Sequence, residues 1–83
     1  MNIRVRLGAG LTPLTGNPRL VLALKEKATV ADLLDHLRLE YPALTPKLDL
    51  AVPMISGRHA PPTEPLAAGQ EVALLLPVAG GCR

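Results

Sequence analysis

One segment near the middle of the chain has the residue spacing of a single amphipathic helix. From Val30 to Tyr41 the aliphatic residues recur every three or four positions, which places them on one face of a helix. Thr29 and Asp32 stand three residues apart at its start and match a capping box, in which side chains satisfy free amides of the first turn. Pro42 ends the segment, because the residue before a proline disfavours the helical conformation. This helix is the most clearly defined element of the sequence, and its apolar stripe needs another element to cover it.

The hydrophobic residues outside this segment alternate along the chain, as they do in strands with one buried face. We expect strands at residues 2–8, 19–25, 51–56 and 71–76. Successive side chains of a strand point to opposite faces. The residues expected to face the helix are Ile3, Val5, Leu7, Leu20, Leu22, Leu24, Val72, Leu74 and Leu76.

The connections between these strands are rich in glycine and proline. Residues 8–18 predict a loop or a wide hairpin connection, and residues 44–50, with Pro46 inside them, predict an irregular turn. Pro53 predicts that the third strand lies at a sheet edge or contains a bulge, because proline cannot donate to a ladder. Residues 57–65 contain three prolines and predict an ordered loop with at most one very short strand.

The order strand, strand, helix, strand, strand predicts an α+β fold with the helix on one sheet face. The first and last strands are the most apolar, so we place them together at the sheet centre, where a right-handed crossover makes them parallel. This is the β-grasp, or ubiquitin-like, arrangement, with a mixed sheet of four to five strands and one main helix. We assign residues 1–79 to this domain and residues 80–83 to a flexible C-terminal tail.

Composition argues against several classes of function. The 83-residue chain has a net charge of only +2, and Tyr41 is its only aromatic residue, so we expect no nucleic-acid binding. The longest apolar run, residues 72–78, is too short to span a membrane. A single cysteine, Cys82, cannot form an internal disulfide, which fits a cytoplasmic protein. His36 and His59 have no second ligand at metal-like spacing, so we expect no metal site.

The C-terminal residues bear most directly on function. Gly80 and Gly81 follow the last hydrophobic strand, and Cys82 and Arg83 come after them. Because glycine has no Cβ, such a tail can thread a narrow channel. That arrangement suits a protein whose own C-terminus is the reacting group. The alternative is a frayed chain end without function, since disorder concentrates at termini.

Three stretches, in order along the chain, resemble the MoaD/ThiS family of ubiquitin-like sulfur carriers. They are the helix start Thr29-Val30-Ala31-Asp32-Leu33-Leu34 with its exit at Tyr41-Pro42, the run Pro65-Leu66-x-x-Gly69-x-Glu71-Val72-Ala73-Leu74-Leu75, and the ending Pro77-Val78-Ala79-Gly80-Gly81. The second stretch is similar to the family's "PL.DGDEVALLP" run, and the third is similar to its "PPVSGG" ending. The resemblance covers the whole chain and is weakest in the middle loop.

The resemblance implies a definite chemistry at the tail. In the family, the carboxylate of the final glycine, here Gly81, is adenylated by an E1-like enzyme of the MoeB/ThiF type that uses ATP. It is then converted to a thiocarboxylate, which passes its sulfur to a sulfur-accepting synthase. Gly80 helps the tail to thread into the partners. The chain is then a protein substrate and sulfur donor, not an enzyme, with no catalytic residue and no bound cofactor.

Two positions depart from the family pattern. Gln70 stands where an aspartate is common, which concerns turn chemistry alone. Cys82 and Arg83 follow the second glycine, so the Gly81 carboxyl is held in a peptide bond. Relatives with such an extension lose it to a zinc-dependent JAMM-type peptidase and tend to serve cysteine or thio-acid metabolite synthesis. We therefore expect a pro-form cleaved between Gly81 and Cys82, with molybdopterin- or thiamine-type pathways as the other destinations.

Several interpretations stay open at this point. Leu75 and Val78 point away from the inward-facing set and form a candidate partner-binding patch. Arg4 and Arg6 belong either to a solvated strand face or to a docking surface. Cys82 is either a discarded residue or a redox group. The alternative functions are a ubiquitin-like modifier that forms isopeptide conjugates and a non-covalent β-grasp binding subunit with an inert tail.

Overall fold

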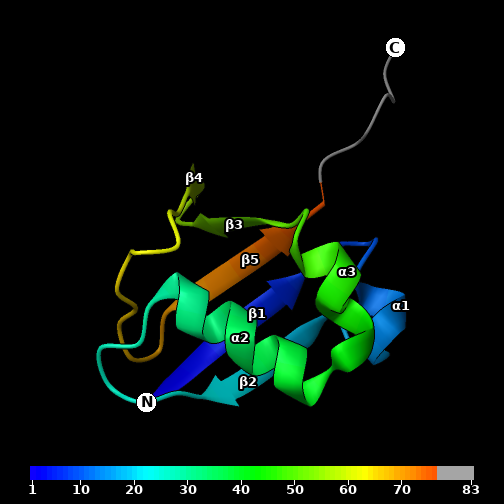
Figure 1. Ribbon diagram of the computed structural model, residues 1–83. Helices are drawn as coiled ribbons and strands as arrows, with labels where there is room; N and C mark the ends of the chain where they lie inside the picture. Colours follow the sequence, from blue (N-terminus) through cyan, green and yellow to red (C-terminus); the bar gives the residue numbers. More distant parts are fainter. Residues whose placement is uncertain (77–83) are drawn as a thin grey trace.

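A mixed five-stranded sheet carries one main helix across one of its faces (Figure 1). The computed structural model describes residues 1–76. The strands are β1 (Asn2–Leu7), β2 (Arg19–Ala23), β3 (Val52–Ile55), β4 (Arg58–His59) and β5 (Glu71–Leu75), in the order β2-β1-β5-β3-β4. β1 and β5 are parallel, and the other neighbours are antiparallel. The predicted β-grasp fold is therefore confirmed, with the first and last strands side by side in the middle of the sheet.

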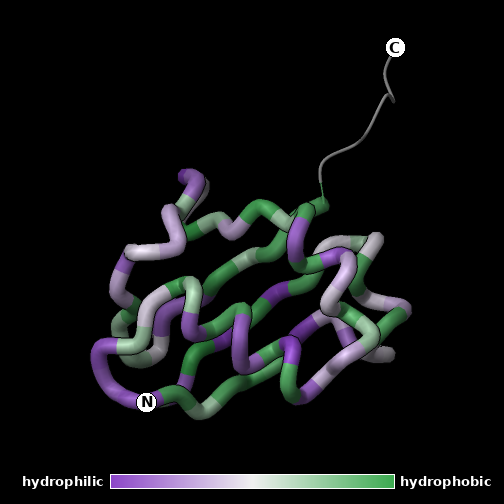
Figure 2. The backbone as a smooth tube through the Cα atoms, viewed as in Figure 1, coloured by the Kyte–Doolittle hydropathy of each residue, from purple (hydrophilic) through white to green (hydrophobic). Residues whose placement is uncertain are grey.

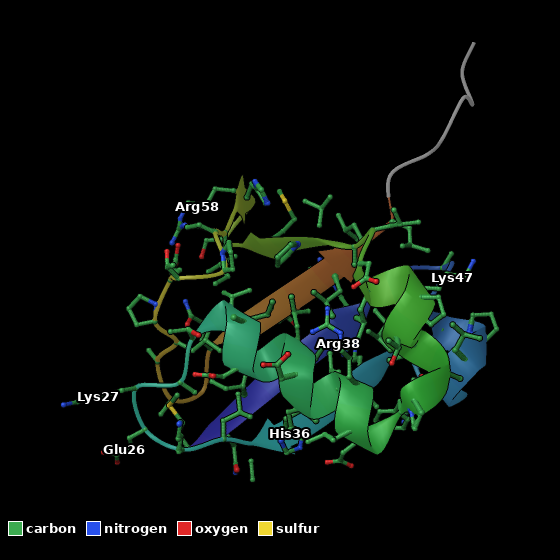
Figure 3. The ribbon with its side chains drawn as sticks, viewed as in Figure 1. Glu26, Lys27, His36, Arg38, Lys47 and Arg58 are labelled. Carbon is green, nitrogen blue, oxygen red and sulfur yellow. The ribbon has the colours of Figure 1, made fainter. Side chains whose placement is uncertain are left out.

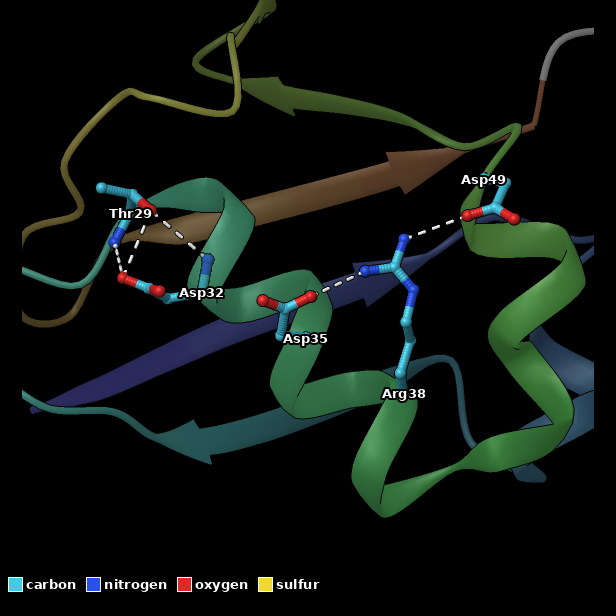
Figure 4. A network of polar contacts seen from close by, with 5 residues as sticks. All are labelled: Thr29, Asp32, Asp35, Arg38 and Asp49. Carbon is cyan, nitrogen blue, oxygen red and sulfur yellow. Dashed lines mark hydrogen bonds and ion pairs between the residues drawn. The ribbon is translucent and has the colours of Figure 1, made fainter.

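The main helix, α2 (Val30–Glu40), begins and ends where the sequence predicts. The backbone N–H of Asp32 donates to Thr29 Oγ1 at 3.3 Å, and the backbone N–H of Thr29 donates to the Asp32 carboxylate at 2.9 Å (Figure 4). The second bond, together with one from the Thr29 hydroxyl, holds the pKa of Asp32 below its usual value. Both halves of the capping box are present, so two amides that a helix start leaves free are satisfied.

Aliphatic side chains fill the space between α2 and the sheet. Figure 2 shows hydrophobic residues along the strands and a hydrophilic loop at residues 25–27, outside the sheet. The described residues include no buried polar or charged side chain, so hydrophobic burial is the main force that holds the layers together. The fully buried side chains of the helix and the central strands are Ile3, Val5, Val30, Leu33, Leu37, Val72 and Leu74.

Two connections that the sequence predicts to be irregular contain short helices. α1 (Thr12–Thr15) lies inside the predicted loop at residues 8–18. The 3-10 helix η1 (Pro42–Leu44) and the helix α3 (Thr45–Leu48) take the place of the irregular turn predicted for residues 44–50, so that prediction is wrong. A proline stands in the first turn of each short helix, where its missing N–H would be unpaired in any case.

The segment from η1 to α3 closes one end of the core. Leu44 and Leu48 are buried there, with 0% and 2% of their surface exposed. Arg38 of α2 donates to Asp35 at 2.8 Å and to Asp49 at 3.1 Å, which links α2 to the residue after α3 (Figure 4). Because exposed ion pairs contribute little stability, the buried leucines hold this segment and the arginine orients it.

Pro53 predicts an edge position or a bulge for β3, and the structure shows neither. The short strand β4 pairs with the far side of β3, and the register of β3 on β5 runs through Pro53 without a break. The carbonyl of Pro53 accepts a hydrogen bond from the N–H of Ala60 at 2.9 Å. The N–H and C=O of one strand residue point to the same side, so the donor that proline lacks faces away from β5. The β3–β5 ladder is therefore intact, and the very short strand predicted within residues 57–65 is confirmed as β4.

Candidate functional site

Most of the site residues predicted from the sequence lie outside the part of the chain that the structure describes. Val78, Gly80, Gly81 and Cys82 come after residue 76. The structure instead defines the root of this tail, which is the end of β5 and the surface around it (Figure 1).

The end of β5 is anchored by the loop that follows β1. The N–H of Gly8 donates to the carbonyl of Leu74 at 2.9 Å, which continues the β1–β5 pairing by one residue. Leu76 is partly buried and packs against the core. A Cβ added at Gly10 would lie 2.5 Å from Leu76 Cδ1, so the missing side chain lets the loop come close to Leu76. The polypeptide is thus attached to the domain as far as Leu76.

Leu75 lies on the sheet face opposite α2, with 43% of its surface exposed, whereas Leu74 faces the helix and is fully buried. The register between β3 and β5 places Val52 beside Leu75 and Met54 beside Ala73. Val52, Met54, Ala73 and Leu75 therefore share this open face, since they occupy alternate positions on neighbouring strands. We call these four residues the apolar patch.

Ala73 forms the floor of a shallow hollow within the apolar patch. It lies between Arg6 of β1 and Met54 of β3 and is only 7% exposed, although no helix within residues 1–76 covers this face. The hollow has a volume of about 220 Å³, and its remaining walls are Ser56, Gly57, Glu71 and Leu75. Because a small side chain stands among larger ones, the patch can accept a protruding side chain of a protein partner.

Charged groups of both signs border the apolar patch. Arg4 and Arg6 are exposed on β1, and Arg4 Nη2 donates to the carbonyl of Gly69 at 3.3 Å. Glu71 is exposed on β5 and is the register partner of Arg4. An apolar centre with a charged rim is typical of protein–protein interfaces, and the rim charges would orient a partner.

Val52, Met54 and Ala73 were not predicted as patch residues from the sequence. Strand alternation predicts which residues of one strand share a face with Leu75. It does not predict which residues of β3 stand beside β5, because that register depends on the turns and the packing between distant segments.

Two further pairs of charged or titratable side chains among residues 1–76 involve Arg58 and His36, which are labelled in Figure 3. Arg58 donates a hydrogen bond of 2.7 Å to Glu64, and this contact lowers the pKa of Glu64 and raises that of Arg58. His36 lies 2.7 Å from Glu40. In the described part of the chain, no three His, Cys, Asp or Glu side chains come together in a group that could hold a metal ion. Nor does any helix there have the length and apolar character needed to cross a membrane.

Comparisons with known proteins cover both the sequence and the fold. A model of the ThiS family matches residues 5–81. The structure is similar to that of SAMP1, a small archaeal modifier protein from Haloferax volcanii, with 31% identity and a TM-score of 0.87 over 98% of this chain and 100% of that chain. No curated protein sequence matches the chain significantly.

Two further structures support the fold alone, because each is only 21% identical to the chain. One is a putative molybdopterin converting factor subunit 1 from Pyrococcus furiosus, with a TM-score of 0.85 over 94% of this chain and 99% of that chain. The other comes from a complex of subunits 1 and 2 of molybdopterin-converting factor from Helicobacter pylori, with a TM-score of 0.70 over 98% of this chain and 100% of that chain.

Proposed function

The chain belongs to the ThiS family, and on that premise we propose that it is a sulfur carrier whose reacting group is the carboxylate of Gly81. Members of this family are small sulfur carrier proteins and not themselves enzymes. One observation carries the proposal: the family match runs from residue 5 to residue 81. It therefore includes Gly80 and Gly81 and stops before Cys82.

The proposed reaction begins by giving the Gly81 carboxylate a better leaving group. A carboxylate oxygen attacks the α-phosphorus of ATP on an E1-like enzyme of the MoeB/ThiF type, which releases pyrophosphate and forms an acyl adenylate. The terminal sulfur of a persulfide then attacks the carbonyl carbon and displaces AMP. A second thiol cleaves the sulfur–sulfur bond and leaves the thiocarboxylate. The carrier supplies the end group, and its partners supply the catalytic groups.

The apolar patch gives this tail a docking surface close to its root. Leu75 is exposed on the open sheet face, while Leu74 and Leu76 attach the end of β5 to the core. A partner that covers the patch would hold the tail root at a fixed place relative to its own active site. By analogy with the neighbour from Helicobacter pylori, which comes from a complex of two subunits, we propose that an enzyme subunit such as a sulfur-accepting synthase docks on this patch.

Processing must come before activation in this proposal. Gly81 is joined to Cys82 in the sequence, so it has no free carboxylate until that bond is cut. A JAMM-type zinc peptidase in the cytoplasm would hydrolyse the Gly81–Cys82 bond and remove Cys82 and Arg83. Because Cys82 would be removed in this step, its thiol would take no part in the activation of Gly81. The sulfur would then serve synthesis of cysteine or a thio-acid metabolite.

Protein modification is a second candidate function, and the similarity to SAMP1 favours it. The chain is 31% identical to that modifier over 98% of its length. The two functions share the adenylated Gly81 and differ in the final nucleophile that takes up the activated acyl group, which is a persulfide sulfur for a carrier and a lysine amine for a modifier.

The intact mass of the chain isolated from its native cells tests the proposal. A sulfur carrier should lack Cys82 and Arg83 and carry one sulfur in place of one C-terminal oxygen. Alkylation of the thiocarboxylate provides an independent check, because a version that ends at Gly81 with an ordinary carboxylate does not react. Conjugates joined from Gly81 to lysines of other proteins would instead establish the modifier function. A mass that retains Arg83 under all growth conditions would exclude both and favour a non-covalent binding subunit.

A further inference from the structure

The strand β2 lies at an open edge of the sheet, on the opposite side from the short edge strand β4 (Figure 1). Its sequence, Arg19-Leu20-Val21-Leu22-Ala23, has one charged residue and no proline. Natural sheets usually protect such an edge with charges, proline, a bulge or a very short strand. β4 has only two residues, so of the two edges only β2 offers a length of backbone to another chain.

The register between β1 and β2 identifies the backbone groups that face outward. The N–H of Leu7 donates to the carbonyl of Pro18, and the N–H of Leu24 donates to the carbonyl of Met1. In an antiparallel ladder the hydrogen-bonded pairs alternate along the strand, so the even-numbered residues of β2 bond to β1. The N–H and C=O groups of Val21 and Ala23 therefore point away from the sheet, where the described residues supply no neighbouring strand.

A groove runs beside this edge, between β2 and α2. It has a volume of about 300 Å³, and the end of β2 contributes Ala23 and Leu24 to it. One face of α2 lines the other side, with residues spaced three or four positions apart: Asp32, Asp35, His36 and Leu39. Figure 3 shows His36 on the side of α2 that lies toward β2.

Leu39 gives the groove an exposed apolar wall. With 83% of its surface exposed, it is the most exposed of the large apolar side chains among residues 1–76. On β2, Val21 is 66% exposed on the opposite sheet face. The side chains of a strand added to β2 would point alternately to the sheet face that α2 covers and to the opposite face. One set would contact Leu39, and the other set would lie next to Val21.

The charges on the groove wall are mainly negative, although the chain as a whole is basic. Asp32 and Asp35 line the groove with a single lysine, Lys25. Asp32 is engaged in the capping box. Asp35 is 70% exposed, and of its two carboxylate oxygens the described residues bond only Oδ1. Asp35 Oδ1 already pairs with Arg38, so a basic side chain that enters the groove would share this carboxylate with Arg38 and bond to its Oδ2.

From these features we infer that the groove between β2 and α2 binds an extended, basic and aliphatic peptide segment of another protein, which pairs with β2 as an added strand. Its backbone bonds to Val21 and Ala23, an aliphatic side chain packs on Leu39, and a lysine or arginine lies next to Asp35. Addition of a strand to a free sheet edge is an established way for proteins to bind extended peptides. This site is separate from the apolar patch, and it does not depend on the chemistry of Gly81.

A synthetic peptide with the sequence Thr-Val-Thr-Val-Thr-Lys-Thr, carrying a fluorescein label, tests the inference by fluorescence polarisation with the full chain. Two control peptides keep the same length, one with proline in place of the central valine and one with glutamate in place of lysine. We expect saturable binding of the first peptide and much weaker binding of both controls. Hydrogen exchange should also slow at the amides of Val21 and Ala23 when the first peptide binds.

Two variants test the groove wall. Leu39→Asp should weaken binding by about tenfold or more, because it removes an aliphatic contact that the bound peptide would bury. Asp35→Lys should reverse the preference between the lysine and glutamate peptides. Leu50→Asp is the matched control, since Leu50 is also exposed, at 65%, and does not line the groove. Circular dichroism checks that each variant is folded.

Three results would overturn the inference. Binding that is equally tight with the proline peptide would show that β2 pairs with no strand. Equal affinities of the Leu39→Asp and Leu50→Asp variants would show that the groove is not the site. A dimer in sedimentation that Leu39→Asp dissociates would show that a second copy of the chain, and not a peptide, occupies the edge.

Discussion

The replacement of Leu75 by aspartate should impair activation of Gly81 while the domain stays folded. Leu75 is the predicted docking residue that the structure describes, and it lies on the open sheet face one position before Leu76. If a partner enzyme covers the apolar patch, the substitution places a charge inside that interface. The reaction at Gly81 itself is unchanged, because the substituted residue lies outside the tail.

The exposed fraction of Leu75 sets the size of the effect. Full burial of a leucine is worth about 1.5–3 kcal/mol, so the 43% that is exposed corresponds to about 0.6–1.3 kcal/mol on docking. Loss of that contact alone, as in Leu75→Ala, should weaken docking by a factor of about 3–9. A carboxylate left unpaired in the interface costs about 1–3 kcal/mol more, so Leu75→Asp should weaken docking about 15-fold or more.

The same substitution should remove only a small part of the free energy of unfolding. The part of Leu75 that is already buried contributes about 0.9–1.7 kcal/mol to folding. This is a minor fraction of the stability of about 5–15 kcal/mol that is typical of a small domain. Circular dichroism and urea unfolding should therefore show a folded protein with a modestly lower midpoint.

The assay measures pyrophosphate release by the activating enzyme, with a version of the chain that ends at Gly81 so that processing does not limit the rate. We expect a raised KM and a nearly unchanged kcat, because the patch binds the partner and does not touch the reacting carboxylate. Leu50→Asp is the matched control, since it places the same charge on an exposed surface outside the patch. If Leu75→Asp and Leu50→Asp have the same KM, the docking role of the apolar patch is refuted.

Three further predictions concern the fold. Leu37→Ala should destabilise the domain by about 2–5 kcal/mol, because Leu37 is fully buried, and urea unfolding measures the loss. Thr29→Ala should cost about 1 kcal/mol in the same assay through loss of the capping bond to the Asp32 amide, whereas Thr29→Ser should keep most of it. The pKa of Glu64 is lower in the folded protein than its ordinary value. Its ionised form therefore stabilises the fold fully at a pH above the ordinary carboxyl pKa. This stabilisation is lost as the pH falls through the folded-state pKa. Thermal unfolding from neutral to acidic pH should therefore show a smaller decrease of the Tm in Glu64→Gln than in the parent.

Most of the fold could be predicted because local patterns and packing agree. The helix stripe, the capping box at Thr29 and the alternation in the first and last strands all indicate one buried layer between a helix and a sheet. The turn predicted for residues 44–50 failed because Pro46 can either break a helix or occupy its first turn, and the local sequence allows both. The burial of Leu44 and Leu48 decides between them, and burial is a property of the whole fold.

The candidate site could be predicted only in part, for a similar reason. Leu75 follows from strand alternation, since its neighbours face the helix. Val52 and Met54 join the apolar patch only through the register of β3 on β5. The groove between β2 and α2 was not predicted, because its walls come from both elements and depend on how the helix packs across the sheet.

The short distance from the domain to the reacting carboxylate links docking to chemistry. Leu76 packs against the core, and the family match ends at Gly81. Residues 77–81 span at most about 18 Å if fully extended. Any enzyme that activates Gly81 must therefore place its reacting centre within that distance of Leu76, which is next to the apolar patch. All enzymes that use this tail as a substrate face the same geometric requirement. We therefore expect successive partners to compete for the apolar patch and not to occupy it at the same time.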